Sequence, residues 1–219
     1  MERPSVRSYS IRRSRITDAQ REARAALQAV HGIDFQLGNI DFAEVFPGVE
    51  KIIMEIGFGM GEATAIIAKN NPNNGYLAVD VHPPGVGKLL ARIFDHDLTN
   101  LKVIEDDAHV VLQHMIADQA LTGIHLFFPD PWPKSKHNKR RIVNAGFLNL
   151  IHLKLIPGGY IHIATDWVPY AKNIQEVFST SDLFTGGVIA KPEWRPLTRF
   201  EGQGIDKDHA VNDMLYTKV

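Results

Sequence analysis

The most constraining feature of this sequence is a regular alternation of short apolar runs with segments of helical periodicity. The runs expected to be strands are 52–56, 76–81, 101–104, 124–128 and 160–164, and the segments expected to be helices are 62–69, 86–94, 108–115 and 145–155. Strands and helices in alternation form parallel βαβ units. The pattern therefore predicts a doubly wound α/β fold with a mostly parallel sheet, closed by an antiparallel C-terminal strand at 214–219.

The chain also divides into an arm and a body. Residues 1–16 are polar and basic with little periodicity, so a flexible N-terminal arm is expected there. Thr17 and Gln20 have the spacing of a capping box, which predicts a helix that begins there and ends near Gly32. At 219 residues and 44% apolar content, the remainder is large enough for one well-packed core. We therefore expect a single domain over residues 17–219.

Composition excludes several classes of function. The chain has no cysteine, so disulfides, thiolate zinc sites and cysteine nucleophiles are ruled out. The histidines show no metal-ligand spacing, and His125 and His162 lie in apolar runs, where packed and hydrogen-bonded histidines are expected. No apolar stretch is long enough to cross a membrane and no secretory signal is present, so we expect a cytoplasmic protein without membrane or metal.

Charge is unevenly placed although the net charge is −1. Seven arginines fall in the first 24 residues, and five Lys or Arg lie within residues 134–141. Two such clusters indicate a surface for a polyanion such as RNA, and the alternative is a solvated basic face.

A glycine-rich turn follows the first expected strand. Gly57, Gly59 and Gly61 alternate with other residues directly after Glu55, at the position where doubly wound sheets bind nucleotides. A dinucleotide fingerprint places its third glycine one residue later. The spacing therefore favours a cofactor without a pyrophosphate, and the alternative is a tight turn that needs glycine only for its conformation.

Acidic residues then appear at or near the end of each of the first four expected strands. They are Glu55, Asp80, the pair Asp106 and Asp107, and Asp130. Ligands of open α/β sheets bind outside these strand ends, so the acids face one crevice. Asp80 suits ribose hydroxyls, Asp107 an adenine amine and Glu55 an ammonium group, although Asp107 is also well placed as a helix cap. S-adenosylmethionine satisfies this set of groups better than NAD does.

Asp130 is held in an unusual local context. Pro129 and Pro131 restrict the backbone on both sides of it, which predicts a rigid carboxylate at a strand end. Trp132 and the basic run 134–141 come directly after it. This order predicts a carboxylate that handles a base beside cations that hold phosphates, and the alternative is a turn in which Asp130 caps a nearby group.

Several long motifs together resemble the bacterial tRNA (guanine-N7-)-methyltransferase family. They are EIGFGMGE, HPPGVG, FFPDPWPKSKHNKRR, TDW and RPLTRFEGQG, and the similarity runs from about residue 12 to the end. The resemblance implies a Rossmann-like class I fold and methyl transfer from S-adenosylmethionine to N7 of guanosine 46 in the tRNA variable loop. We expect either a monomer or a homodimer.

The resemblance assigns roles to individual residues. Cofactor binding is implied for Glu55, Gly57, Gly59, Asp80, Asp107 and Asp130, the last also being catalytic. Substrate binding is implied for Lys134, Asp166, Thr198, Arg199, Phe200 and Glu201, and RNA contact for Lys136, His137, Asn138, Lys139, Arg140 and Arg141. The sequence departs from the family pattern at Asp80, where Glu is common, and at Gln203, Asp208, Ala210 and Asn212, which affects the C-terminal loop.

The expected chemistry needs no general base, because guanine N7 carries a lone pair and no proton. We therefore expect Asp130 to orient the base and to stabilise the positive charge that methylation creates. Two other classes remain open from sequence: a nicotinamide-dependent oxidoreductase, which the glycine spacing disfavours, and a non-catalytic RNA-binding protein, which has no need of the strand-end acids.

Overall fold

A computed structural model describes residues 8–9, 18–197, 201 and 211–219. Its elements, in chain order, are α1 (Asp18–His31), α2 (Phe42–Val45), β1 (Lys51–Ile56), α3 (Glu62–Asn70), β2 (Asn74–Val79), α4 (Pro83–Asp95), β3 (Leu101–Ile104), α5 (Ala108–His114), β4 (Leu121–Phe127), the 3-10 helix η1 (Ser135–Arg140), α6 (Ala145–Lys154), β5 (Leu155–Thr165), α7 (Val168–Ser179), β6 (Phe184–Ile189) and β7 (Asn212–Lys218). Strands and helices alternate as the apolar pattern predicts.

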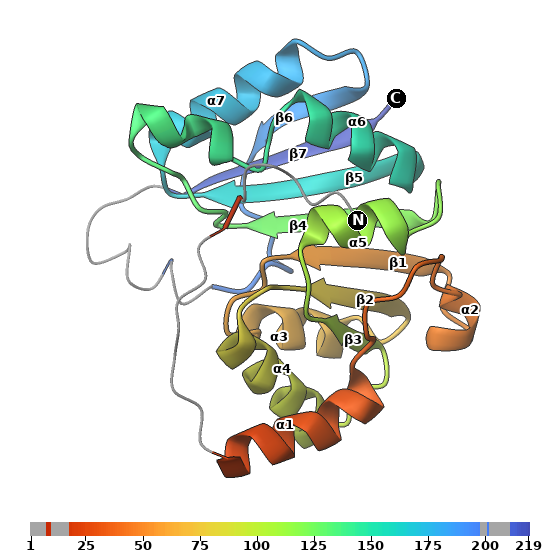
Figure 1. The fold of residues 1–219 in the computed structure, drawn as a ribbon. Coiled ribbons are helices and arrows are strands. Elements are labelled where there is room, and N and C mark those ends of the chain that lie inside the picture. Colours follow the sequence, from red (N-terminus) through yellow and green to blue (C-terminus); the bar gives the residue numbers. More distant parts are fainter. Residues whose placement is uncertain (1–7, 10–17, 198–200, 202–210) are drawn as a thin grey trace.

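The strands form one seven-stranded sheet in the order β3-β2-β1-β4-β5-β7-β6 (Figure 1). β1 to β5 are parallel, and β7 is antiparallel to both β5 and β6. The chain builds outward from β1 to β3 and then returns to place β4 on the other side of β1, which makes the β1/β4 pair the switch point of the sheet. The predictions of a mostly parallel doubly wound sheet and an antiparallel final strand are confirmed.

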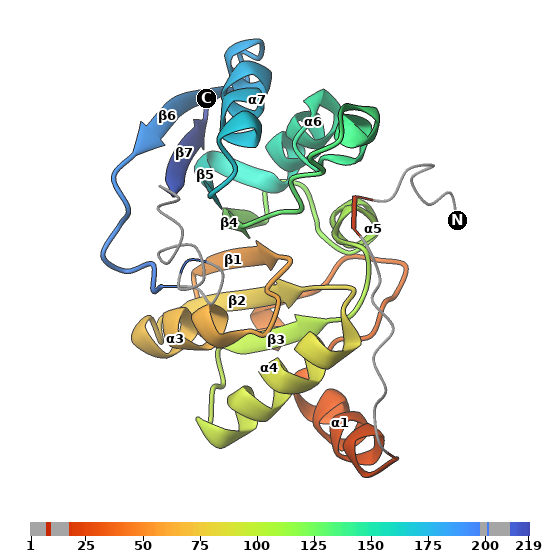
Figure 2. The ribbon, with the colours of Figure 1, turned by 90° about the vertical axis from the view of Figure 1, so that its left-hand side faces the viewer.

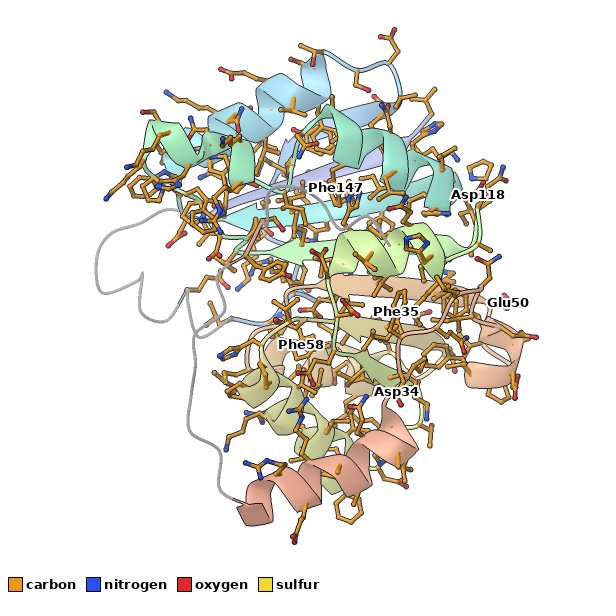
Figure 3. The ribbon with its side chains drawn as sticks, viewed as in Figure 1. Asp34, Phe35, Glu50, Phe58, Asp118 and Phe147 are labelled. Atoms are coloured by element: carbon orange, nitrogen blue, oxygen red, sulfur yellow. The ribbon has the colours of Figure 1, made fainter. Side chains whose placement is uncertain are left out.

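Helices cover both faces of the sheet. α5, α6 and α7 pack over one face, with Phe147 of α6 in that core, and α3 and α4 pack over the other, with Phe58 of the glycine turn in the second core (Figures 2 and 3). Alternate residues of β1 divide between them, since Met54 belongs to the first core and Ile53 to the second. Burial on both faces accounts for the nearly continuous apolar runs that the strands show in sequence.

Two elements at the C-terminal side were not among the expected ones. β6 lies at the edge of the sheet beside β7. Its Thr-Gly-Gly sequence lacks the apolar alternation that indicates a strand. α7 has Pro169 in its first turn, where proline is tolerated although it resembles a breaker in sequence. β5 begins at Leu155, earlier than the expected residue 160. The Pro-Gly-Gly stretch near its start resembles a turn in sequence, so this part of the strand was not predicted.

The N-terminus of α4 is packed against the backbone of the glycine turn. A methyl group on Gly85 would collide with the carbonyl oxygen of Gly59, and backbone cannot move aside cheaply. We predict that Gly85→Ala lowers the free energy of unfolding by about 1–3 kcal/mol in urea titrations. Gly87→Ala in the same helix is the control, because its methyl group would lie 3.7 Å from Arg24 Cδ, an ordinary contact. Equal effects of the two substitutions would contradict this packing.

Candidate active site

The glycine turn after β1 is held open by Asp80. Gly57, Gly59 and Gly61 all adopt positive φ, at 75°, 60° and 71°. One carboxylate oxygen of Asp80 accepts a hydrogen bond from the Gly59 amide at 2.9 Å, and the other accepts from the His82 amide at 2.9 Å. A side chain added at Gly57 would meet no atom within 4 Å. The turn is therefore a rigid backbone surface with open space above Gly57.

Glu55 is a buried acid directly before this turn, with only 4% of its surface exposed. Burial raises the pKa of Glu55 to about 7, and the charge of the nearby Asp80 adds to the shift. Burial likewise raises the pKa of Asp80, against its backbone hydrogen bonds. A buried acid with this pKa is ready to ionise when a cationic group arrives, which suits an ammonium-bearing ligand.

Asp107 lies at the N-terminus of α5 and caps that helix. It is buried and accepts a hydrogen bond from the His109 amide at 2.8 Å, while Asp106 accepts from the Asp107 amide at 2.7 Å. The capping role that the sequence left open is therefore present. A role in binding a cofactor stays a prediction.

Asp130 lies in a turn that is bracketed by two aromatic residues in the left-handed region. Phe128 has φ of 53° and Trp132 has φ of 43°, conformations that are costly for bulky side chains. The Phe128 amide donates to the Ala164 carbonyl at 2.7 Å, which ties the start of the turn to β5. Asp130 itself is exposed. A carboxylate is thus presented to solvent on a backbone that its surroundings must hold in place.

The Trp132 side chain is packed against neighbouring residues, and Arg140 covers one face of its ring. The Arg140 guanidinium lies 3.7 Å from the centre of its ring, and its indole N–H donates to the Ser8 carbonyl at 3.0 Å. Arg140 also donates to the Tyr9 carbonyl at 3.1 Å. Ser8 and Tyr9 are the described part of the expected arm, so this part of the N-terminus contacts the Asp130 turn.

The basic run divides into exposed and engaged residues. Lys134, Lys136, Asn138 and Lys139 are exposed, and His137 is half-buried. Arg141 differs from the expectation for an RNA-contacting residue, because its side chain is only 7% exposed and donates to the Pro131 carbonyl at 3.0 Å. A pocket of about 760 Å³ opens beside this run between α5 and α6, with Asp107, Lys139 and Asn144 in its lining.

The C-terminal motif is anchored by a buried ionic network. Arg195 donates to both carboxylate oxygens of Glu201, at 2.7 and 2.9 Å, and to both of Asp213, at 2.7 and 2.8 Å. His162 Nε2 lies 2.7 Å from Asp213, and the Lys191 ammonium lies 3.6 Å from Glu201. Contacts with Arg195 and His162 hold the pKa of Asp213 below its ordinary value despite burial. Glu201 therefore anchors the segment, whereas Thr198, Arg199 and Phe200 lie outside the described residues.

The remaining candidates occupy simple positions. Asp166 is half-buried at the end of β5, and its predecessor Thr165 accepts a hydrogen bond from the Trp167 amide at 3.2 Å. His125 and His162 are packed in the sheet as predicted, and burial lowers the pKa of His125 to about 3. Neither the pairing of Arg195 with Asp213 nor the inward orientation of Arg141 is predicted from sequence, because both depend on residues far apart in the chain.

No helix in the described ranges is both long enough and apolar enough to cross a membrane. Within the same part of the chain, no group of three or more His, Asp or Glu side chains is placed to hold a metal ion.

Comparison with known proteins agrees with this geometry. A family model described as "Putative methyltransferase" matches residues 49–214. The solved 16S rRNA methyltransferase KamB aligns with a TM-score of 0.60 at 13% identity, covering 84% of this chain and 95% of KamB. An rRNA methylase from Streptococcus thermophilus aligns with a TM-score of 0.53 at 17% identity, covering 94% and 99%. The fold is that of the Rossmann-like methyltransferases.

Relatives of higher sequence identity narrow the class. The tRNA (guanine-N(7)-)-methyltransferase of Streptomyces avermitilis is 46% identical and covers 98% of this chain and 76% of the relative. The protein of the same name from Nitrosospira multiformis is 45% identical, with 97% and 94% covered. The chain belongs to the tRNA (guanine-N7-)-methyltransferase family.

The raised pKa of Glu55 predicts a pH-dependent stability. Between its ordinary value of 4.5 and about 7, the folded protein holds a proton that the unfolded chain has released. The contribution of protonated Glu55 to the free energy of unfolding is therefore lost as the pH rises through this window. Relative to Glu55→Gln, the wild type should lose about 3 kcal/mol of stability between pH 4 and pH 8 in urea titrations. Exposed Glu50→Gln is the control, and a pH-independent difference for Glu55→Gln would contradict the assignment.

The ionic network predicts a strong effect of Glu201 on stability. Glu201→Gln leaves the buried Arg195 with one charged partner and should lower the free energy of unfolding by about 3 kcal/mol. Glu193→Gln removes an exposed charge from the same segment and should change it by less than about 0.5 kcal/mol. Chemical denaturation measures both, and a Glu201 effect as small as the control would show that the network contributes little.

Proposed function

We propose that the protein transfers a methyl group from S-adenosylmethionine to N7 of guanosine 46 in the variable loop of tRNA. The observation that carries the proposal is the parallel pairing of β1 with β4, in which Glu55 lies opposite His125. Because of this pairing, the glycine turn after β1 and the Asp130 turn after β4 lie side by side at the same edge of the sheet. The names of the relatives supply the reaction, and the site supplies groups suited to it.

The residues after the strands fit the methyl donor by their chemistry. S-adenosylmethionine supplies an activated methyl group on a sulfonium, and carries an ammonium, two ribose hydroxyls and an adenine amine. In the proposal, Gly57 and Gly59 let it approach the backbone, and Glu55 faces the ammonium. Asp80 accepts from the ribose hydroxyls and Asp107 from the adenine amine, since carboxylate oxygens can accept more than one hydrogen bond. Asp130 forms the edge of the cofactor site that faces the tRNA.

Asp130 does not act as a base in this proposal, because N7 of guanine has no proton to lose. Its carboxylate accepts from guanine N1–H or N2–H, which aligns N7 with the methyl group for in-line displacement. The same negative charge stabilises the cationic ring that methylation produces. Lys134, Asp166 and the segment Thr198–Phe200 contact the substrate, and Glu201 supports that segment through Arg195.

Phosphates of the tRNA are bound by the exposed basic residues after the turn. Lys136 and Lys139 are exposed to solvent, and His137, Asn138 and Arg140 extend the same surface. Such contacts are electrostatic, so affinity falls as salt rises. An oxidoreductase is not supported, because the glycine spacing and the family both point to methyl transfer.

The test is methylation of an unmodified tRNA transcript with labelled S-adenosylmethionine, followed by mapping of the product nucleoside. We expect one methyl group on N7 of guanosine 46, and no methylation of a transcript with adenosine at that position. Asp130→Asn should reduce the rate by at least about 100-fold, because an amide cannot stabilise the developing charge. Exposed Asp182→Asn is the control. A methyl group at another site would refute the proposed function. A near-normal rate for Asp130→Asn would refute the role of Asp130.

A further inference from the structure

Arg141 ends the basic run but does not share its surface. The preceding cations from Lys134 to Lys139 are exposed, whereas the Arg141 side chain is 7% exposed. Its Nε donates to the Pro131 carbonyl at 3.0 Å, and its Nη1 donates to the Asn173 side-chain oxygen at 3.1 Å. A guanidinium with these contacts faces the protein interior, so its charge is poorly placed to meet an RNA phosphate.

The group that Arg141 holds is the backbone of the turn that carries Asp130. Pro131 lies between Asp130 and Trp132, and both Trp132 and Phe128 have positive φ. Backbone in this region costs on the order of 1–3 kcal/mol per residue and persists only where the surroundings enforce it. The hydrogen bond from Arg141 to the Pro131 carbonyl is one such restraint, and it acts one residue away from the carboxylate.

Helix α7 fixes the other end of this restraint. Asn173 and Tyr170 both belong to α7, whose residues Tyr170, Ala171 and Ile174 are buried in the first core. The Arg141 guanidinium lies 4.9 Å from the centre of the Tyr170 ring, and the Tyr170 hydroxyl accepts from the Val143 amide at 3.4 Å. Arg141 therefore connects the Asp130 turn to a helix that the core holds rigidly.

Electrostatics support the same connection. Burial raises the pKa of Tyr170 to about 12, the positive charge of Arg141 opposes the rise, and the negative charge of Asp130 adds to it. Asp130 is thus within electrostatic reach of the ring over which the guanidinium lies.

We propose that Arg141 is a positioning residue for Asp130, acting through the Pro131 carbonyl and anchored by Asn173, and that it is not a phosphate ligand of the RNA surface. This inference rests on the proposed function of Asp130. Its consequence is a division of labour within one basic run, in which Lys139 affects tRNA affinity and Arg141 affects the rate of methyl transfer.

The experiment separates rate from affinity. Single-turnover methyl transfer to a tRNA transcript and the tRNA dissociation constant at several salt concentrations are measured for Arg141→Lys, Lys139→Ala and, as a control at the opposite end of the sheet, Lys51→Ala. Arg141→Lys retains the charge but loses the paired hydrogen bonds, and should slow transfer by about 10- to 100-fold with an unchanged salt slope. Lys139→Ala should weaken binding and reduce the salt slope by about one.

A second pair of variants tests the anchor without touching the basic run. Asn173→Leu removes the acceptor for Arg141, and Asn173→Asp keeps one at the same position. The leucine variant should slow transfer by about 10-fold, whereas the aspartate variant should stay within about two-fold of wild type. Thermal unfolding and the affinity for S-adenosylhomocysteine confirm that each variant is folded.

The inference is overturned if Arg141→Lys transfers methyl at the wild-type rate, if it changes the salt slope as Lys139→Ala does, or if both Asn173 variants behave alike. Failure of the proposed function is distinguishable, because the wild-type protein itself would then leave N7 of guanosine 46 unmethylated.

Discussion

The parallel pairing of β1 with β4 is the contact on which the rest of the site depends. Because β1 and β4 are parallel neighbours, the glycine turn after β1 and the Asp130 turn after β4 lie at the same edge of the sheet. One turn is open backbone suited to a cofactor, and the other presents an exposed carboxylate. The proposed reaction requires only that these two turns be held at a fixed separation.

Both turns are held by charged groups that the core partly buries. Asp80 fixes the glycine turn through two backbone amides, and Arg141 fixes the Asp130 turn through one carbonyl. Arg195 holds the C-terminal segment to β7 through Asp213 and Glu201. Asp80 and Arg141 orient backbone through their hydrogen bonds, whereas Arg195 pairs with the carboxylates of two other side chains. The positive φ angles of Phe128 and Trp132 are energetically costly, so the Asp130 turn needs such restraints to keep its conformation.

Much of this arrangement follows from sequence, and the limits have physical causes. The parallel order and the strand-end acids follow from short-range patterns, because strand and helix periodicity and chain direction decide which ends meet. β6 was missed because its glycines carry no apolar pattern. The inward turn of Arg141 and the pairing of Glu201 with Arg195 were missed because each depends on a partner brought close only by folding, such as Asn173 for Arg141.

The most direct test of the central claim is a crystal structure with S-adenosylhomocysteine and a guanosine nucleotide bound together. The account predicts that the sulfur lies above the glycine turn. It also predicts that an Asp130 oxygen accepts from guanine N1–H or N2–H at about 3 Å, with N7 directed at the position of the lost methyl group. A guanine bound with N7 directed away from the sulfur, or with Asp130 out of hydrogen-bonding reach, would contradict it.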